Sequence, residues 1–326
     1  MKKRILSGMR PTGKLHLGHL AGALENWNKL QDEYVCFFMV ADLHALMSEY
    51  EHPQTLKENI TDNVADWLAC GICPEKSVIF IQSQVKEHLE LFYLLSLITP
   101  LGLLERCPTY KEQLREIKGR DLSTYGFLGY PVLQAADILL YKAEAVPVGE
   151  DQLPHVELTR QIARKFNHLY KTELFPEPKA LLTPAKRLLG LDGRKMSKSY
   201  GNTIVLSDNP ESVLKKVKDM FTDPLRIKIA DAGHPHKCNV FSYYSLFFPE
   251  LKDGVSSSCE SASAGCTQCK KELAEKLSQL LEPIQKKRHE FLKDKDFIPQ
   301  ILDQGRLKAG MAAQKTVSEI KHLLKL

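Results

Sequence analysis

A glycine-bearing turn near the N-terminus has the residue types of an anion-binding site. Residues 11–19 read Pro-Thr-Gly-Lys-Leu-His-Leu-Gly-His, and they follow a short apolar stretch and open a helical pattern. Unpaired backbone N–H groups and the helix dipole converge at such a helix start and favour an anion. His16 and His19 add side-chain donors, and Gly18 allows a nucleotide to approach the backbone closely. Taken alone, the same residues also fit an ordinary surface turn.

A basic loop far downstream has the residues of a phosphate clamp. Residues 193–199 read Gly-Arg-Lys-Met-Ser-Lys-Ser. Lys195 and Lys198 carry point charges on long stems, and a loop that holds them can close over a phosphate. A solvated basic loop is the alternative for this segment when it is taken alone.

Four of the eight cysteines fall in one short region. Cys238, Cys259, Cys266 and Cys269 are spaced C-x20-C-x6-C-x2-C. Four thiolates favour a tetrahedral sulfur site for zinc or iron–sulfur. A zinc ribbon usually has two C-x2-C pairs, whereas this region has one. Because the N-terminus does not have the pattern of an export signal, a disulfide framework is the weaker interpretation.

Alternating apolar runs and helical patterns predict the scaffold that positions these residues. Residues 34–41 and 77–82 are apolar runs typical of strands buried on both faces, and residues 145–149 predict another short strand. Helical patterns cover residues 17–31, 54–69 and 153–166. This alternation predicts an α/β fold with a Rossmann-like, doubly wound parallel sheet.

The composition describes a globular protein of one or two domains. The chain has 326 residues, 43% of them hydrophobic and 26% charged, with a mean hydropathy of −0.26. No apolar run reaches the roughly 18–20 residues of a membrane span, so we expect a cytoplasmic protein without a membrane partner. The net charge of +5 permits an anionic partner.

The pattern changes near residue 200. We expect a catalytic domain over residues 1–200 and an α-helical C-terminal domain over residues 201–326, with helices over 211–220 and from 270 onwards. Residues 253–266 are small and polar, and we interpret them as a loop that carries cysteine ligands.

Taken together, the N-terminal motif at residues 11–19 and the downstream motif at residues 193–199 resemble the HIGH and KMSKS signatures of class I aminoacyl-tRNA synthetases. Four further segments, residues 5–13, 40–45, 130–138 and 146–152, resemble the tryptophanyl-tRNA synthetases, so the resemblance extends over most of the chain. It implies an ATP site on a Rossmann-like fold, a homodimer, and charging of the cognate tRNA, tRNA(Trp), with no role for DNA.

The choice of amino acid depends on hydrogen bonding. Tyrosyl-tRNA synthetases share the fold, both signatures and the pattern found here at Tyr130, Gln134 and Asp137. An indole offers one donor and no acceptor, whereas a phenol hydroxyl both donates and accepts. Tyrosine enzymes typically have a tyrosine on the first strand that pairs with the phenol. This chain has Leu6 there. We therefore expect Asp137 to accept the indole N–H. Tyrosyl specificity and a non-catalytic RNA-binding paralogue are the alternatives.

The resemblance also assigns site residues by position. The expected tryptophan contacts are Asp137, Tyr130, Gln134, Gln152, Val40, Val148 and His44. The expected ATP contacts are Arg10, Pro11, Thr12, Gly18, His19, Gly149, Glu150, Asp151, Lys186, Lys195, Met196, Ser197, Lys198 and Ser199. The expected catalytic groups are His16, His19, Lys111, Lys195 and Lys198, which would stabilise charge on the pyrophosphate together with Mg²⁺. The family often has glutamine at the position of Arg10, which leaves the role of Arg10 open.

The cysteine region also has a counterpart in the family. A subset of bacterial tryptophanyl-tRNA synthetases carries a 4Fe–4S cluster on a similar pattern, with about 22 residues in the first gap instead of the 20 found here. The resemblance favours a 4Fe–4S cluster, with Zn²⁺ as the alternative. Nearby basic residues suit the anticodon end of a tRNA, although each also fits a solvated helix face: Lys270, Lys271, Lys286, Lys287 and Arg288.

Overall fold

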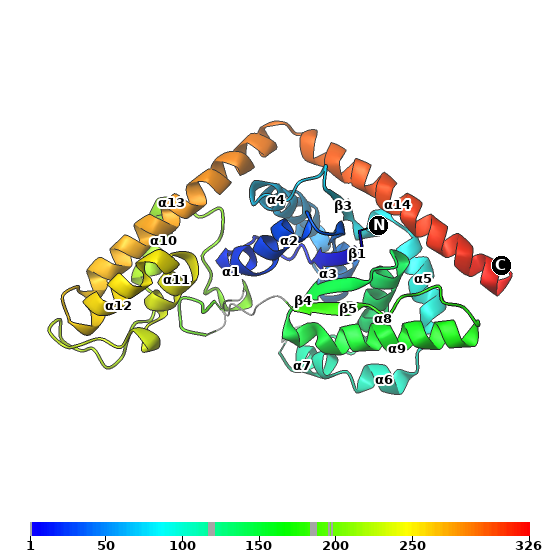
Figure 1. The fold of residues 1–326 in the computed structure, drawn as a ribbon, viewed down its shortest axis with the longest axis horizontal. Coiled ribbons are helices and arrows are strands. Elements are labelled where there is room, and N and C mark those ends of the chain that lie inside the picture. The colour runs from blue at the N-terminus through cyan, green and yellow to red at the C-terminus, as the bar shows by residue number, and fades with distance from the viewer. Residues whose placement is uncertain (1, 117–120, 183–187, 195, 197) are drawn as a thin grey trace.

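A parallel sheet forms the centre of the protein (Figure 1). The computed structural model describes residues 2–116, 121–182, 188–194, 196 and 198–326. Within them the sheet has five strands, in the order β3-β2-β1-β4-β5. The strands are β1 (Arg4–Met9), β2 (Val35–Val40), β3 (Ser77–Ile81), β4 (Ala145–Val148) and β5 (Lys179–Leu182). The order reverses between β1 and β4, and in such sheets ligands bind at the carboxyl ends of the strands beside that point. The predicted α/β fold is confirmed.

Helices cover both faces of the sheet. Those of the first half are α1 (Leu17–His19), α2 (Glu25–Leu30), α3 (Asp42–Glu49), α4 (Leu56–Ala69), α5 (Glu87–Ser96), α6 (Leu101–Glu105), α7 (Pro108–Glu116), α8 (Tyr125–Leu140) and α9 (Leu153–Leu169). A π-helical segment, Leu20–Leu24, joins α1 to α2, so residues 17–30 are helical almost as predicted. None of the helices in the described ranges is long and apolar enough to cross a lipid bilayer.

Two hydrophobic clusters fix the sheet between its helices. In the first, the ring of Trp27 of α2 stacks on that of Phe38 of β2, with 4.4 Å between the ring centroids. The same ring meets the ring of Trp67 of α4 edge-on, with 5.0 Å between the centroids. The second joins α5, α8 and α9 to the opposite face. Each fully buried side chain of this size contributes roughly 1.5–3 kcal/mol. The carboxyl edge of the sheet is therefore a rigid platform for a site.

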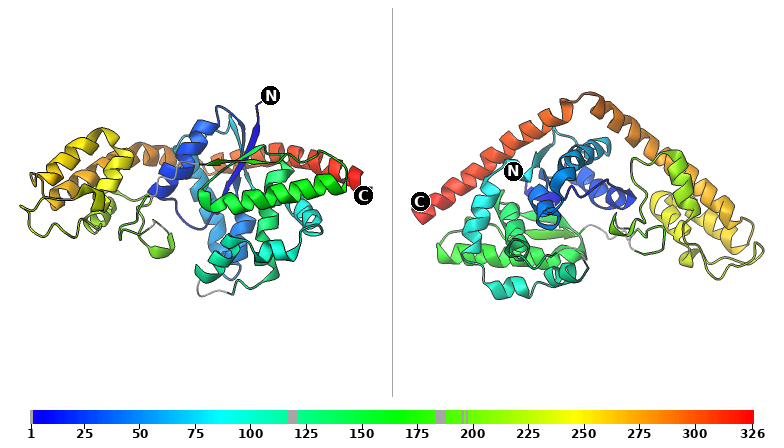
Figure 2. Two further views of the ribbon diagram at one scale, coloured as in Figure 1. Left: turned by 60° about the horizontal axis from the view of Figure 1, so that its bottom comes forward. Right: turned by 180° about the vertical axis from the view of Figure 1, so that it is seen from behind.

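The C-terminal part is helical, as predicted, and it returns to the sheet. It contains α10 (Pro210–Lys218), α11 (Asn239–Phe247), α12 (Lys252–Glu260), α13 (Cys266–Lys293) and α14 (Phe297–Leu324). The long helices α13 and α14 meet at an angle, and α14 runs back along β3 and α5 (Figures 1 and 2). At the crossing with β3, a Cβ added to Gly305 would lie 1.7 Å from the carbonyl oxygen of Ile79, so only glycine fits. The domain boundary near residue 200 stays a prediction.

Two expectations for this part differ from the structure. Residues 253–266 are not one loop, because α12 covers most of them, and Val255 of α12 packs against the first hydrophobic cluster. Arg288 does not project freely, because its guanidinium donates to Asp66 over 2.9 Å and to Asp62 over 2.6 Å. These ion pairs join α13 to α4 of the sheet domain.

Candidate active site

The two predicted signatures lie against each other. Nζ of Lys198 donates to the backbone oxygen of Gly13 over 2.8 Å, across 185 residues of sequence. Buried Met196 places its sulfur 3.6 Å from the position that a Cβ of Gly18 would take. Gly13 has a φ of +100°, which glycine adopts without strain. The basic loop and the N-terminal turn therefore form one site.

His16 and His19 are neutral donors in this site. The backbone N–H of Gly18 donates to Nδ1 of His16 over 3.1 Å, and the backbone N–H of His16 donates to Nδ1 of His19 over 3.2 Å. Burial, with Lys198 nearby, lowers the pKa of His16 to about 4, and burial with the neighbouring His16 lowers the pKa of His19 well below its usual value. A neutral imidazole that accepts at Nδ1 has its proton on Nε2. Each ring therefore has an Nε2–H group to donate to an anion.

Asp137 is a buried carboxylate surrounded by donors. Helix α8 begins after Thr124, whose side chain accepts the N–H of Phe127, and the spacing of Tyr130, Gln134 and Asp137 places them on one face. Asp137 is 1% exposed. Its Oδ1 accepts from Nε2 of Gln82 over 2.8 Å and from Nδ1 of His88 over 2.6 Å.

The second carboxylate oxygen completes this network. Oδ2 of Asp137 accepts from Nε2 of His44 over 2.7 Å and from Gln82 over 3.0 Å. Burial raises the pKa of Asp137, but the hydrogen bonds from His44 and His88 outweigh it and hold the pKa below its usual value. Asp137 is therefore an ionised acceptor near neutral pH.

A second network joins three more of the predicted residues. The hydroxyl of Tyr130 lies 2.9 Å from Nε2 of His155, and Nδ1 of His155 lies 3.0 Å from Oε1 of Gln152. Nε2 of Gln134 donates to the same Oε1 over 3.5 Å. The polar ends of Tyr130, Gln134 and Gln152 thus meet around one buried histidine.

Sequence reasoning missed the partners of these groups: Gln82, His88, Tyr141 and His155. One signal was available for Gln82, because it directly follows β3. The carboxyl ends of neighbouring parallel strands share one edge of the sheet, so a polar residue there lies near the site. The two histidines have no comparable sequence signal, since only the fold brings them to Asp137 and Tyr130.

Some predicted residues lie apart from these networks. Val40 packs in the first hydrophobic cluster and Val148 in the second, so they do not face each other across one slot. Lys111 is exposed on α7, close to Thr109, whose hydroxyl donates to the backbone oxygen of Asp151 over 3.4 Å. Nη1 of Arg10 lies 3.5 Å from Oγ of Ser48.

The remaining predicted residues border the same edge of the sheet. Pro11 and Thr12 lie in the turn after β1, Gly149, Glu150 and Asp151 follow β4, and Ser199 lies in the short 3₁₀ helix Lys198–Tyr200. Lys186, Lys195 and Ser197 lie outside the described residues.

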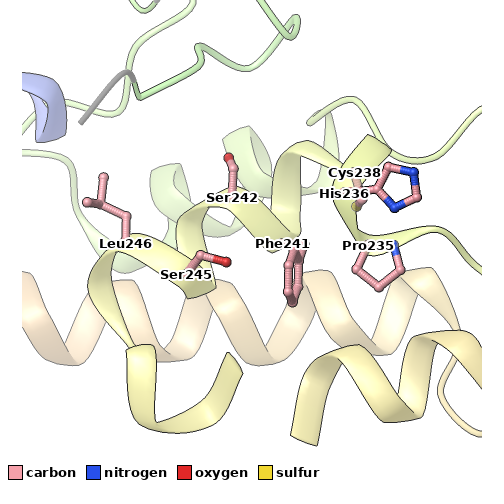
Figure 3. A pocket seen from close by; sticks show the side chains of 7 residues that line it. All are labelled: Pro235, His236, Cys238, Phe241, Ser242, Ser245 and Leu246. Atoms are coloured by element: carbon pink, nitrogen blue, oxygen red, sulfur yellow. The ribbon is translucent and has the colours of Figure 1, made fainter. Parts of the chain in front are cut away.

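The four downstream cysteines are neighbours. Burial raises the pKa of Cys269 to about 12, with Cys238, Cys259 and Cys266 adding to the shift through their charges. In the described ranges, however, no three His, Cys, Asp or Glu side chains come together as a metal centre requires. Four sulfur donors therefore fit an iron–sulfur or zinc site in chemistry but not in spacing. A hollow of about 360 Å³ opens beside Cys238, lined by Phe241, His236 and neighbouring residues of α11 (Figure 3).

The sheet topology and the joined signatures define a nucleotide-binding enzyme site, and comparison with known proteins identifies its family. The model of "tRNA synthetases class I (W and Y)" matches residues 1–282. The chain therefore belongs to the class I tRNA synthetases for tryptophan and tyrosine.

Similar proteins within this family are named as enzymes that use tryptophan. The tryptophan–tRNA ligase of Thermotoga maritima is 52% identical over 99% of both chains, and that of Aquifex aeolicus is 44% identical over 99% of this chain and 100% of its own. A tryptophanyl-tRNA synthetase from Campylobacter jejuni, solved with ADP and tryptophan, has a TM-score of 0.90 at 35% identity and covers 99% of this chain and 100% of its own.

Proposed function

We propose that this protein is a tryptophan–tRNA ligase. It activates L-tryptophan with ATP to tryptophanyl-AMP and pyrophosphate, and then transfers tryptophan to tRNA(Trp). The observation that carries the proposal is the ionised, buried Asp137 on α8, at the same edge of the sheet as the joined signatures. An ionised carboxylate accepts hydrogen bonds and cannot donate one, which matches the indole, whose ring offers one N–H donor and no acceptor.

Activation requires positioning and charge stabilisation, and no protein nucleophile. The tryptophan carboxylate attacks the α-phosphorus of ATP in line, while Tyr130 and Gln152 hold the amino-acid end. The Nε2–H groups of His16 and His19 and the ammonium of Lys198 stabilise the charge that develops on the pyrophosphate. Mg²⁺ enters on the phosphates as part of the substrate.

The other contacts are proposed from the family resemblance. The turn at Gly149–Asp151 holds the ribose, the backbone near Lys186 borders the adenine, and Lys111 reaches the pyrophosphate. Lys195, Ser197 and Ser199 complete the basic loop. Gln134, His44 and Val148 border the tryptophan. Val40, the last residue of β2, packs into the first hydrophobic cluster.

The experiment that tests this function is ATP–pyrophosphate exchange with tryptophan and tyrosine side by side. We expect exchange with tryptophan alone, because a pocket with one acceptor leaves a phenol hydroxyl incompletely paired. Exchange driven by tyrosine would reject the assignment of Asp137 to the indole. Folded protein that exchanges with neither amino acid would favour a non-catalytic RNA-binding paralogue.

We also propose that Cys238, Cys259, Cys266 and Cys269 hold a 4Fe–4S cluster, with Zn²⁺ as the alternative. The four thiols belong to one region of the helical part, where the other three add to the raised pKa of Cys269, and their sulfur chemistry supports the proposal although their spacing does not match a formed cluster. Protein purified without air should contain iron and acid-labile sulfide in equal amounts and show the visible absorbance of a thiolate-bound cluster. Cys266→Ser should lose both, while Cys73→Ser, outside the group, should keep them. Zinc without iron would reject the cluster.

The helical domain, residues 201–326, is proposed to bind the anticodon end of the tRNA. Lys271 and Lys287 are exposed on α13, which supports a contact with phosphates. Lys270 and Arg288 are less suited, because they bind the backbone of Lys218 and the carboxylates of α4. The protein is proposed to act in the cytoplasm.

The active form is proposed to be a homodimer. Leu89 and Tyr93 of α5 and Leu97, which follows its last residue, form an exposed apolar stripe, and Leu101 extends it into α6. Such a stripe is costly in water and is covered by a second copy. Sedimentation equilibrium should give twice the chain mass of 37.0 kDa. Tyr93→Lys should give single chains, whereas the same substitution at exposed Tyr125, outside the stripe, should not. Single chains from the wild-type protein would reject the homodimer.

A further inference from the structure

A chain of hydrogen bonds from Asp151 to Tyr130 has one fixed direction. A carboxylate only accepts, so the 2.9 Å contact between Oδ2 of Asp151 and Nε2 of Gln152 makes that nitrogen a donor. The other end of the Gln152 amide, Oε1, is then an acceptor. It faces Nδ1 of His155 at 3.0 Å, so Nδ1 must have the proton.

The same reasoning shows that the hydroxyl of Tyr130 is the donor in its hydrogen bond with His155. Burial, with His44 nearby, lowers the pKa of His155 to about 4, so the ring is neutral near pH 7. A neutral ring that donates at Nδ1 has a bare Nε2. Nε2 therefore accepts the O–H of Tyr130 over 2.9 Å, and burial holds the pKa of Tyr130 above its usual range. The hydroxyl proton points at His155, and the remaining lone pairs are free to accept.

We infer that His155 is a positioning residue that makes the hydroxyl of Tyr130 an acceptor for the α-ammonium group of tryptophan. The inference rests on the proposed function, in which Tyr130 holds the amino-acid end. His155 is 1% exposed, so it acts through Tyr130 rather than by contact with the substrate. Without it, the O–H of Tyr130 is free to rotate and present its proton to the cation.

Two analogues separate this role from a structural one. Tryptamine keeps the ammonium and lacks the carboxylate, whereas indole-3-propionate keeps the carboxylate and lacks the ammonium. Each is measured as a competitive inhibitor of tryptophan-dependent ATP–pyrophosphate exchange. In His155→Phe we expect the KM for tryptophan and the Ki for tryptamine to rise about 10- to 100-fold, the range for a hydrogen bond to a charged group. The Ki for indole-3-propionate and the kcat should change by less than about threefold.

Matched variants complete the test. In His155→Gln the amide can accept from Tyr130 and donate to Gln152, so tryptamine binding should return to near the wild-type value. His168→Phe, exposed on the same helix, should change nothing. In a Tyr130→Phe background, His155→Phe should have little further effect on tryptamine. If His155→Phe does not fold, His155→Met replaces it, because an unbranched side chain adapts to the same space.

The outcomes separate the inference from the proposed function. Equal losses for both analogues in a folded variant, or additive effects with Tyr130→Phe, would show a structural role and overturn the inference. Wild-type protein that does not exchange with tryptophan would instead overturn the proposed function.

Discussion

Asp137→Asn should lower kcat/KM for tryptophan in ATP–pyrophosphate exchange by about 10²- to 10³-fold, because it replaces a buried charged acceptor. Both carboxylate oxygens of Asp137 are surrounded by N–H groups of Gln82, His44 and His88. An asparagine places an NH₂ group against one of these donors and retains a single neutral acceptor. The indole contact is present in the bound state as well as in the transition state, so most of the loss should appear in KM.

The same substitution should also destabilise the fold, since a donor in this network is left without an acceptor. Thermal unfolding measures that part separately. Asp223→Asn is the matched control, because Asp223 is another buried carboxylate that pairs with a histidine, His234, but lies in the helical part. It should leave the KM for tryptophan unchanged. A KM for Asp137→Asn within about threefold of wild type would remove Asp137 from the indole contact.

The sequence predicts the scaffold because the scaffold depends on local patterns. Apolar runs at residues 34–41 and 77–82 become β2 and β3, and the spacing of Tyr130, Gln134 and Asp137 places them on one helix face. The two signatures meet where Nζ of Lys198 donates to the backbone oxygen of Gly13, in the turn that follows β1. Hydrophobic periodicity and the positions of the strand ends in the sequence are therefore enough to predict these parts of the scaffold.

The partners of the site residues depend on distances that no local pattern encodes. His88 lies 49 residues from Asp137 along the chain, and its imidazole meets the carboxylate because α5 packs on α8. Alternation along β2 directs Val40 into the first hydrophobic cluster, whereas Val148 of β4 packs in the second, and the two patterns in the sequence do not show this difference. The small residues of α12 predicted a loop, yet tertiary packing overrides their weak helix propensity.

Lys198→Ala should lower kcat for tryptophan-dependent exchange by about 10²- to 10³-fold, the usual cost of removing one group that stabilises transition-state charge. The KM for tryptophan should stay nearly constant, because Lys198 belongs to the phosphate side of the site. Its Nζ already lies over the N-terminal turn, 2.8 Å from the oxygen of Gly13. Lys14→Ala is the matched control, since Lys14 is exposed in the same turn. Equal losses in both variants would indicate a general effect of positive charge.

The pH dependence gives Lys198 a signature of its own. Burial, assisted by the charge of Arg10 and opposed by that of Asp66, lowers the pKa of Lys198 to about 8. The ammonium form of Lys198 is the active one. In the free enzyme Lys198 is fully protonated well below this pH, and the active form is lost as the pH rises through this value. kcat/KM for ATP should therefore fall about tenfold per pH unit above pH 8. His16 and His19, the nearest titratable rings, have lowered pKa values and are neutral over this range, so they add no second step. In Lys198→Arg the guanidinium keeps its charge, and the fall should disappear even if the rate is reduced. A fall that persists unchanged in Lys198→Arg would assign the alkaline limb to another group.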